Sequence, residues 1–247
     1  MVDQLPNRGL ELEMLEEMGF SSIDDLFSDI PEQVRMTEQL DLPAPQSEEE
    51  IIADARRLLG SNLAMGDVVS FLGAGLYRNY VPASVFQLIT RGEFLTSYTP
   101  YQPEVSQGML QAMWEFQTLV SELIGLPISN LSLYDGSTAA AEALTCAVRV
   151  HNRKATQKDT VYISELTPPD RVSVMQNYCQ GAGIEIKYLH HHQDGTIDIS
   201  SAEQAAGSCG IYVEQPNPLG LLDGGYTNLK EIIGENTALI VGIQPIS

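Results

Sequence analysis

The second half of the chain alternates between strand-like and helix-like segments, and this alternation constrains the fold more than any other feature. From residue 128 onward, short runs of β-branched and other apolar residues alternate with stretches whose apolar residues recur every three or four positions. The predicted strands are 128–134, 160–164, 184–189, 211–214 and 237–243, and the predicted helices are 137–150, 168–180 and 228–233. Such alternation requires right-handed crossovers, so it predicts an α/β fold: a mainly parallel sheet with helices on both faces.

The first 66 residues predict a helical arm, and residues 67–247 predict the α/β domain that follows it. Three helix signals in the arm combine a cap with an apolar run. They are a run at 10–18 closed by Gly19, Ser22 followed three residues later by Asp25, and Ser47 followed by Glu50 ahead of a run at 48–59. We expect the arm to pack on the main body or on a partner chain.

Residues 91–125 join a stiff polar segment to an amphipathic helix. Apolar residues recur at spacings of three and four between 105 and 124, Pro103 suits the first helical position, and Gly125 suits the residue after the helix. Two prolines stiffen the segment before the helix, which presents Tyr98, Thr99, Tyr101, Gln102 and Glu104. Both a binding site and a rigid connector fit this pattern.

Charge and cysteine usage limit the classes of partner. The net charge of -20, from 33 acidic and 13 basic residues, opposes binding to nucleic acid or to an anionic membrane surface. The cysteines, Cys146, Cys179 and Cys209, are widely spaced and form no C-x-x-C pair, which indicates reduced thiols. No segment approaches the roughly 18 apolar residues of a membrane helix, and the amino terminus lacks a basic start and an apolar run. We therefore expect a soluble, cytoplasmic protein.

Three short patterns have ordinary explanations. A short strand at 68–72 would run into Gly73-Ala74-Gly75, which lacks the third glycine of a dinucleotide-binding turn and suits a tight backbone turn. His190, His191 and His192 are consecutive, and neighbours in a strand point to opposite faces, so we expect no metal site there. No serine, cysteine or histidine lies in a recognisable nucleophile motif.

Three longer motifs carry a resemblance to a known family. They are SFLGAGLYRNYVP at 70–82, YTPYQPEVSQG at 98–108 and LYDGSTAAAEAL at 133–144. In this order they resemble the amino-terminal half of glycine decarboxylase, the P-protein of the glycine cleavage system, and most closely subunit 1, the alpha chain, of the form split into two polypeptides. The resemblance implies the large-domain fold of fold-type I pyridoxal-phosphate (PLP) transferases. It also implies a complex that decarboxylates glycine, passes the aminomethyl group to the lipoyl group of H-protein and releases carbon dioxide.

The resemblance implies PLP chemistry, but this chain's residues argue against a working cofactor site. The turn formed by Gly136, Ser137 and Thr138 has the layout that cradles a cofactor phosphate, yet Asp135 beside it would repel a phosphate, and an ordinary helix cap fits as well. Gln244 stands where an Asp would hold the pyridinium proton. No lysine has a Schiff-base context, the four being Lys154, Lys158, Lys187 and Lys230. Whether the vestigial turn still binds an anion is left open.

In the resembled two-polypeptide enzymes, the beta subunit carries the PLP lysine, so we expect PLP on a partner beta chain and none covalently bound here. The resemblance makes the segment at 98–104 the best candidate to reach into the partner's pocket. The residues implied to line that pocket are Tyr77, Tyr98, Thr99, Tyr101, Gln102 and Glu104. Alpha subunits of the family are much longer than 247 residues, so we expect a fragment or a truncated chain.

Two alternatives accompany this interpretation. The first is a non-catalytic scaffold or interaction domain that kept the fold of a PLP enzyme and lost the pocket. The second is a self-sufficient PLP enzyme acting on another amino acid, which the contexts of the four lysines disfavour. The main expectation is a glycine decarboxylase subunit that is inactive alone.

Overall fold

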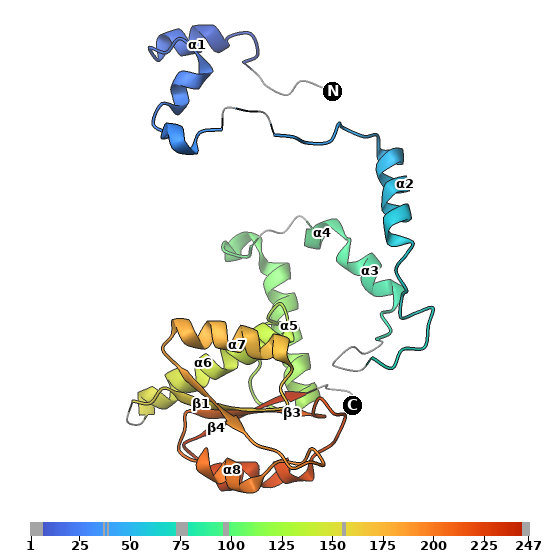
Figure 1. Cartoon of the computed structure of the whole chain (residues 1–247), viewed down its shortest axis with the longest axis vertical. Coiled ribbons are helices and arrows are strands. Elements are labelled where there is room, and N and C mark those ends of the chain that lie inside the picture. The colour runs from blue at the N-terminus through green and yellow to red at the C-terminus, as the bar shows by residue number, and fades with distance from the viewer. Residues whose placement is uncertain are drawn as a thin grey trace. The chain divides into compact units, whose positions relative to one another are not determined.

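The computed structural model describes residues 7–36, 38, 40–72, 79–95, 99–154 and 157–243 (Figure 1). The chain divides into two units, residues 1–63 and residues 64–247.

Unit 1 is helical, and its caps are those that the sequence predicts. Ser22 accepts a hydrogen bond from the backbone of Asp25 and Ser47 accepts one from the backbone of Glu50, while each carboxylate bonds back to the cap residue. These reciprocal bonds satisfy amide groups that have no partner inside a helix. The helices are α1 at Glu11–Glu17, the 3-10 helices η1 at Ile23–Phe27 and η2 at Glu32–Val34, and α2 at Glu48–Leu59.

The start of unit 2 differs from the predicted pattern. Residues 68–72 form no strand; Phe71 keeps 94% of its surface exposed, and no neighbouring strand pairs with this segment in the described part of the chain. The two following helices were not predicted: α3 at Ala83–Ile89 and α4 at Gly92–Leu95. The Gly73-Ala74-Gly75 turn lies outside the described residues.

The predicted amphipathic helix is present as α5, Gln107–Ile124, and Gly125 ends it in the left-handed conformation with φ 70°. Pro103 begins a separate 3-10 helix, η3 at Pro103–Val105, so the prediction that it opens the long helix is wrong. The strand predicted at 128–134 is also wrong. Ile128 is 83% exposed, and the segment pairs with no strand of the described sheet.

The remaining alternation folds as predicted, into a parallel four-stranded sheet with the order β2-β1-β3-β4. The strands are β1 at Thr160–Ser164, β2 at Glu185–Leu189, β3 at Gly210–Gln215 and β4 at Ala238–Ile243. The predicted helices are present as α6 at Gly136–Lys154, α7 at Pro169–Gly181 and α9 at Leu229–Ile233. Two further short helices were missed: α8 at Ile199–Gln204 and η4 at Gly224–Asn228.

Helices cover both faces of the sheet, with α6 and α7 on one side and α8 on the other (Figure 1). Side chains alternate along β3, so Tyr212 joins the core beneath α6 and α7, while Ile211 and Val213 join the core beneath α8 and α9. A Cβ added at Gly210 would lie 3.0 Å from the Cβ of Ala147, so this glycine lets α6 approach β3 closely. The carboxyl ends of β3 and β4 and the start of α6 then border one cavity.

Candidate functional site

A cavity of about 390 Å³ lies at the carboxyl edge of the sheet, where ligands bind in open α/β folds. The helix α6 contributes small residues to its wall, including Gly136, Ala139 and Ala143. The first turn of α7 contributes Arg171, and the ends of β3 and β4 complete the wall. The sheet therefore places a ligand-sized space at the edge where open α/β sheets bind ligands.

An ion pair lies in this cavity wall. Arg171 donates from Nη1 to Oε1 of Glu214 at 2.5 Å and to the hydroxyl of Tyr212 at 3.3 Å, and that hydroxyl lies 3.1 Å from the same Oε1 atom. The Arg171 and Glu214 side chains are only 25% and 13% exposed. Burial raises the pKa of the Tyr212 phenol, and the adjacent Glu214 raises it further. Burial opposes the charge of Arg171, but Tyr212 and Glu214 more than offset this and raise its pKa. Arg171 is therefore a permanent cation and Tyr212 a neutral donor.

The predicted phosphate-type turn is a helix cap. The Asp135 carboxylate accepts hydrogen bonds from the backbone N–H of Thr138 at 2.8 Å and from its hydroxyl at 2.8 Å. These bonds from Thr138 lower the pKa of Asp135, with Ser137 and Arg171 contributing less. A carboxylate thus already occupies the amino terminus of α6, where Gly136, Ser137 and Thr138 would have to present N–H groups to a phosphate.

No lysine whose side chain is described is placed to bind PLP in this cavity. A Schiff base needs a lysine in the cavity, and none of Lys158, Lys187 and Lys230 lines it. Lys158 donates to the carbonyl of Gly207 and Lys230 to that of Thr237, both of which precede strands and so lie at the opposite, amino edge of the sheet. Lys187 pairs with Glu185 within β2. The side chain of Lys154 is not described, and Gln244 lies outside the described residues.

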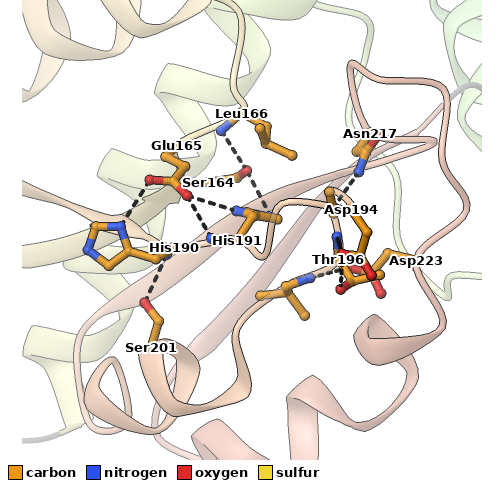
Figure 2. Close-up of polar contacts among 12 residues, drawn as sticks. Ser164, Glu165, Leu166, His190, His191, Asp194, Thr196, Ser201, Asn217 and Asp223 are labelled. Carbon is orange, nitrogen blue, oxygen red and sulfur yellow. Dashed lines mark hydrogen bonds and ion pairs between the residues drawn. The ribbon is translucent and has the colours of Figure 1, made fainter.

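A second polar cluster, which was not predicted from the sequence, lies where β1 and β2 end (Figure 2). The Glu165 carboxylate accepts from Nδ1 of His190 at 2.9 Å and from the backbone N–H of His191 at 2.6 Å. The hydroxyl of Ser164 lies 3.4 Å from Nε2 of His191 and accepts from the backbone N–H of Leu166. The His191 side chain is 2% exposed. Burial lowers the pKa of His191, although Glu165 and Asp223 oppose this.

Ser164, His191 and Glu165 are the residue types of a nucleophile triad, but the burial of Ser164 and of the His191 side chain excludes that chemistry. Ser164 is 2% exposed, so no substrate carbonyl can reach its hydroxyl. The cluster instead ties the end of β1 to the end of β2. The run of three histidines was the available signal, and it indicated only that His191 lies on a different face from its neighbours.

Two buried polar residues, Asn217 and Asp223, hold the loops beside this cluster (Figure 2). Asn217 donates to the carbonyl of Gly195, and its side-chain oxygen accepts from the backbone of Leu219 and Leu221. Asp223 accepts from the backbone of Ile197 at 2.7 Å and of Gly225 at 2.8 Å. Their side chains are engaged with backbone groups, which is a structural role.

The candidate segment at 98–104 is described only in part. Tyr77 and Tyr98 lie outside the described residues. Thr99, Tyr101, Gln102 and Glu104 are exposed, Tyr101 by 85%, and none of the four lines the cavity at β3 and β4. The structure therefore does not gather these four side chains in that cavity. The described part of the chain contains no cluster of three or more potential metal ligands and no helix long and apolar enough to cross a membrane.

Comparison with known proteins shows a match over nearly the whole chain. A family model described as the glycine cleavage system P-protein matches residues 6–247. The probable glycine dehydrogenase (decarboxylating) subunit 1 of Pyrococcus abyssi is 44% identical over 243 residues, covering 98% of this chain and 53% of that protein. The probable subunit 1 of Listeria innocua is 40% identical over 240 residues, covering 96% and 52%. This chain thus spans about half the length of these relatives.

Solved structures agree with this match. The crystal structure of a glycine decarboxylase (P-protein) in inhibitor-bound form superposes with a TM-score of 0.77 at 34% identity, covering 99% of this chain and 54% of that one. A cysteine desulfurase from Thermococcus onnurineus superposes with a TM-score of 0.50 at 16% identity, covering 81% of this chain and 48% of that one, which supports the fold alone.

Proposed function

The chain belongs to the glycine cleavage system P-protein family, and from this we propose that it is all or part of subunit 1 of a two-subunit glycine dehydrogenase (decarboxylating). The main support for this proposal is the match over 98% of the chain to proteins named as that subunit. The proposed enzyme decarboxylates glycine, transfers the aminomethyl group to the lipoyl group of H-protein and releases carbon dioxide. Its partners are therefore a second subunit and the H-protein.

We propose that the second, beta subunit holds the PLP of this enzyme. When bound, PLP supplies the electron sink that decarboxylation requires. Two features of this chain support the assignment: Asp135 occupies the helix terminus that a phosphate would need, and the three lysines whose side chains are described lie outside the cavity. This chain's proposed contribution is structure and part of the wall of the partner's pocket.

The proposed pocket-lining residues are Tyr77, Tyr98, Thr99, Tyr101, Gln102 and Glu104. Support comes from the exposure of the described members, since Tyr101 presents 85% of its surface from a segment held between Pro100 and Pro103. A phenol on a stiff segment offers apolar area and a hydrogen-bonding tip at a small entropic cost. Such side chains suit a pocket that is completed only in the complex.

We also propose that residues 1–66 act as a helical arm that packs on the α/β domain, residues 67–247, or on the partner. The arm exposes apolar side chains along α2, including Ile51 at 53% and Leu59 at 65%. A cytoplasmic location is proposed because Cys146, Cys179 and Cys209 are all free thiols, which suits a reducing compartment.

The test is reconstitution. The chain is assayed alone, with subunit 2, and with subunit 2 plus lipoylated H-protein, by measuring labelled carbon dioxide released from carboxyl-labelled glycine. We expect release only when both subunits and the H-protein are present. Release by this chain alone, or by subunit 2 alone at the full rate of the mixture, would contradict the proposal.

A further inference from the structure

The buried imidazole of His191 has one nitrogen without a hydrogen-bond partner. Its Nε2 atom lies 3.4 Å from the Ser164 hydroxyl, whereas Nδ1 is buried and has no hydrogen-bond partner among the described residues. Oε1 of Glu165 lies 3.8 Å from Nδ1, beyond hydrogen-bond distance, and accepts instead from the backbone N–H of His191. A protonated ring must donate from both nitrogens, so this packing suits only the neutral ring.

Three titratable groups face His191 from the described elements packed around it. Glu165 follows β1 and Asp223 precedes η4, and both carboxylates favour the charged ring, while His190, just after β2, opposes it. Burial outweighs the two carboxylates and lowers the pKa of His191. The closed structure therefore resists a proton that an opened, solvated ring accepts at about pH 6.5.

The segment that covers His191 is a tight loop, residues 190–198. His191 pairs with Ile197 in an isolated antiparallel bridge, and the backbone N–H of His192 donates to the carbonyl of Thr196 at 2.8 Å. Gly195 turns the loop with φ 84°. These bonds close the loop on the imidazole, so a change at His191 acts on the whole loop.

Two buried side chains connect this loop to the cavity wall (Figure 2). Asn217 donates to the carbonyl of Gly195 at 3.0 Å, and Asp223 accepts from the backbone N–H of Ile197 at 2.7 Å. The backbone N–H of Asp223 donates to the side-chain oxygen of Gln215 at 3.2 Å. The loop is therefore bonded to the segment at 215–223, which contributes three residues to the lining of the cavity at β3 and β4: Gln215, Pro216 and Pro218.

We propose that His191 is an acid-sensitive latch on this cavity wall. While the imidazole is neutral, the loop at 190–198 stays closed and holds the segment at 215–223 in place. When the imidazole is protonated, the ring leaves its buried position, and the loop and the segment open together. The latch goes beyond the proposed function, because it concerns the control of the cavity by pH and is independent of the molecules that the complex binds.

Native-state hydrogen exchange of the full chain, at about pH 7.5 and about pH 5.5, tests the latch. The reporters are amides that donate to Asp223 or Asn217, those of Ile197, Leu221 and Gly225. Corrected for intrinsic exchange rates, their opening constant should rise up to about tenfold at the lower pH, because the opened ring titrates at about 6.5. A local opening exposes little surface, so low urea concentrations should hardly change it. No rise, or a rise with the urea dependence of the β3 amides, would overturn the proposal.

Two variants assign the effect to the buried ring. His191→Gln cannot be protonated, so the rise should disappear, whereas His192→Gln removes an exposed imidazole of the same loop and should retain it. A rise that persists in His191→Gln overturns the proposal. An NMR titration of the histidine rings in the original chain needs no variant. The His191 ring should titrate below its ordinary pKa, and a midpoint at or above about 6.5 would overturn the latch, because the closed loop would then not resist the proton.

Discussion

Arg171 at the start of α7 and Glu214 near the end of β3 form a 2.5 Å ion pair inside the cavity at the carboxyl edge of the sheet. The pair joins a helix to a strand at the place where α/β proteins bind ligands. Tyr212 bonds to both partners, so the three side chains form one cluster. The cavity wall therefore carries its own fixed charges, which any ligand must match.

The first prediction concerns the stability of this pair. Arg171→Met and Glu214→Leu should each lower the free energy of unfolding by about 1–3 kcal/mol, because each leaves a partly buried charge without its partner. The double variant should lose less than the sum of the two single losses. Urea denaturation of the four chains measures the coupling.

The exposed Lys187–Glu185 pair supplies the control for this cycle. Lys187 and Glu185 are 46% and 58% exposed, so Lys187→Gln should change the free energy of unfolding by less than about 0.5 kcal/mol. Strict additivity of the Arg171 and Glu214 effects would show that the pair does not act as a unit.

The second prediction concerns cofactor labelling. Incubation with PLP, borohydride reduction and intact-mass analysis should give no adduct at a single defined lysine of this chain. The described lysines bond to backbone carbonyls or to Glu185 and lie outside the cavity. Subunit 2 treated in parallel should carry one adduct at one position. One adduct per chain at a defined lysine would instead support the alternative that this chain is a self-sufficient PLP enzyme.

The fold was largely predictable because local signals and the global fold agree in most elements. Ser22 and Ser47 have the capping partners that the sequence indicates, and β1 begins and ends at the predicted residues. The strand predicted at 128–134 failed for a physical reason. An apolar run shows that a segment can pair, but pairing also needs a neighbouring strand, and the described sheet offers none there.

The charged cluster was not predictable from local pattern. Arg171 and Glu214 are 43 positions apart, and they meet only because α7 begins beside the end of β3. Ser164 and His191 are 27 positions apart and meet because β1 and β2 end together. The helix cap was different, since a cap depends on residues within one turn: the sequence indicated a cap at residues 136–138, and the structure shows that Asp135 is the residue that accepts the hydrogen bonds.

The third prediction tests the segment before α5 in the assembled enzyme. Tyr101→Phe removes one hydroxyl, and we expect kcat/KM for glycine in the reconstituted complex to fall about tenfold, as for the loss of one hydrogen bond to a charged group. The stability of the chain alone should not change, because Tyr101 is 85% exposed. Tyr134→Phe alters another fully exposed phenol and serves as the control. Full activity of Tyr101→Phe would favour a scaffold role for this segment.

The last prediction concerns acid stability and His191. Burial lowers the pKa of His191 in the folded chain, while Glu165 and Asp223 oppose the shift and His190 adds to it. The unfolded chain regains the ordinary histidine pKa of about 6.5. As the pH falls below about 6.5, the unfolded chain therefore binds a proton that the folded chain resists, and stability decreases.

His191→Gln should flatten this decrease between about pH 7 and pH 5, as measured by urea denaturation at each pH. The exposed His192→Gln serves as the control and should retain the slope. Glu165 contributes in a lower range, because its hydrogen bond to His190 lowers its pKa from 4.5 and its stabilisation is lost only as the pH falls further. If His191→Gln and the original chain lose stability in parallel above pH 5, the buried imidazole is not the group responsible.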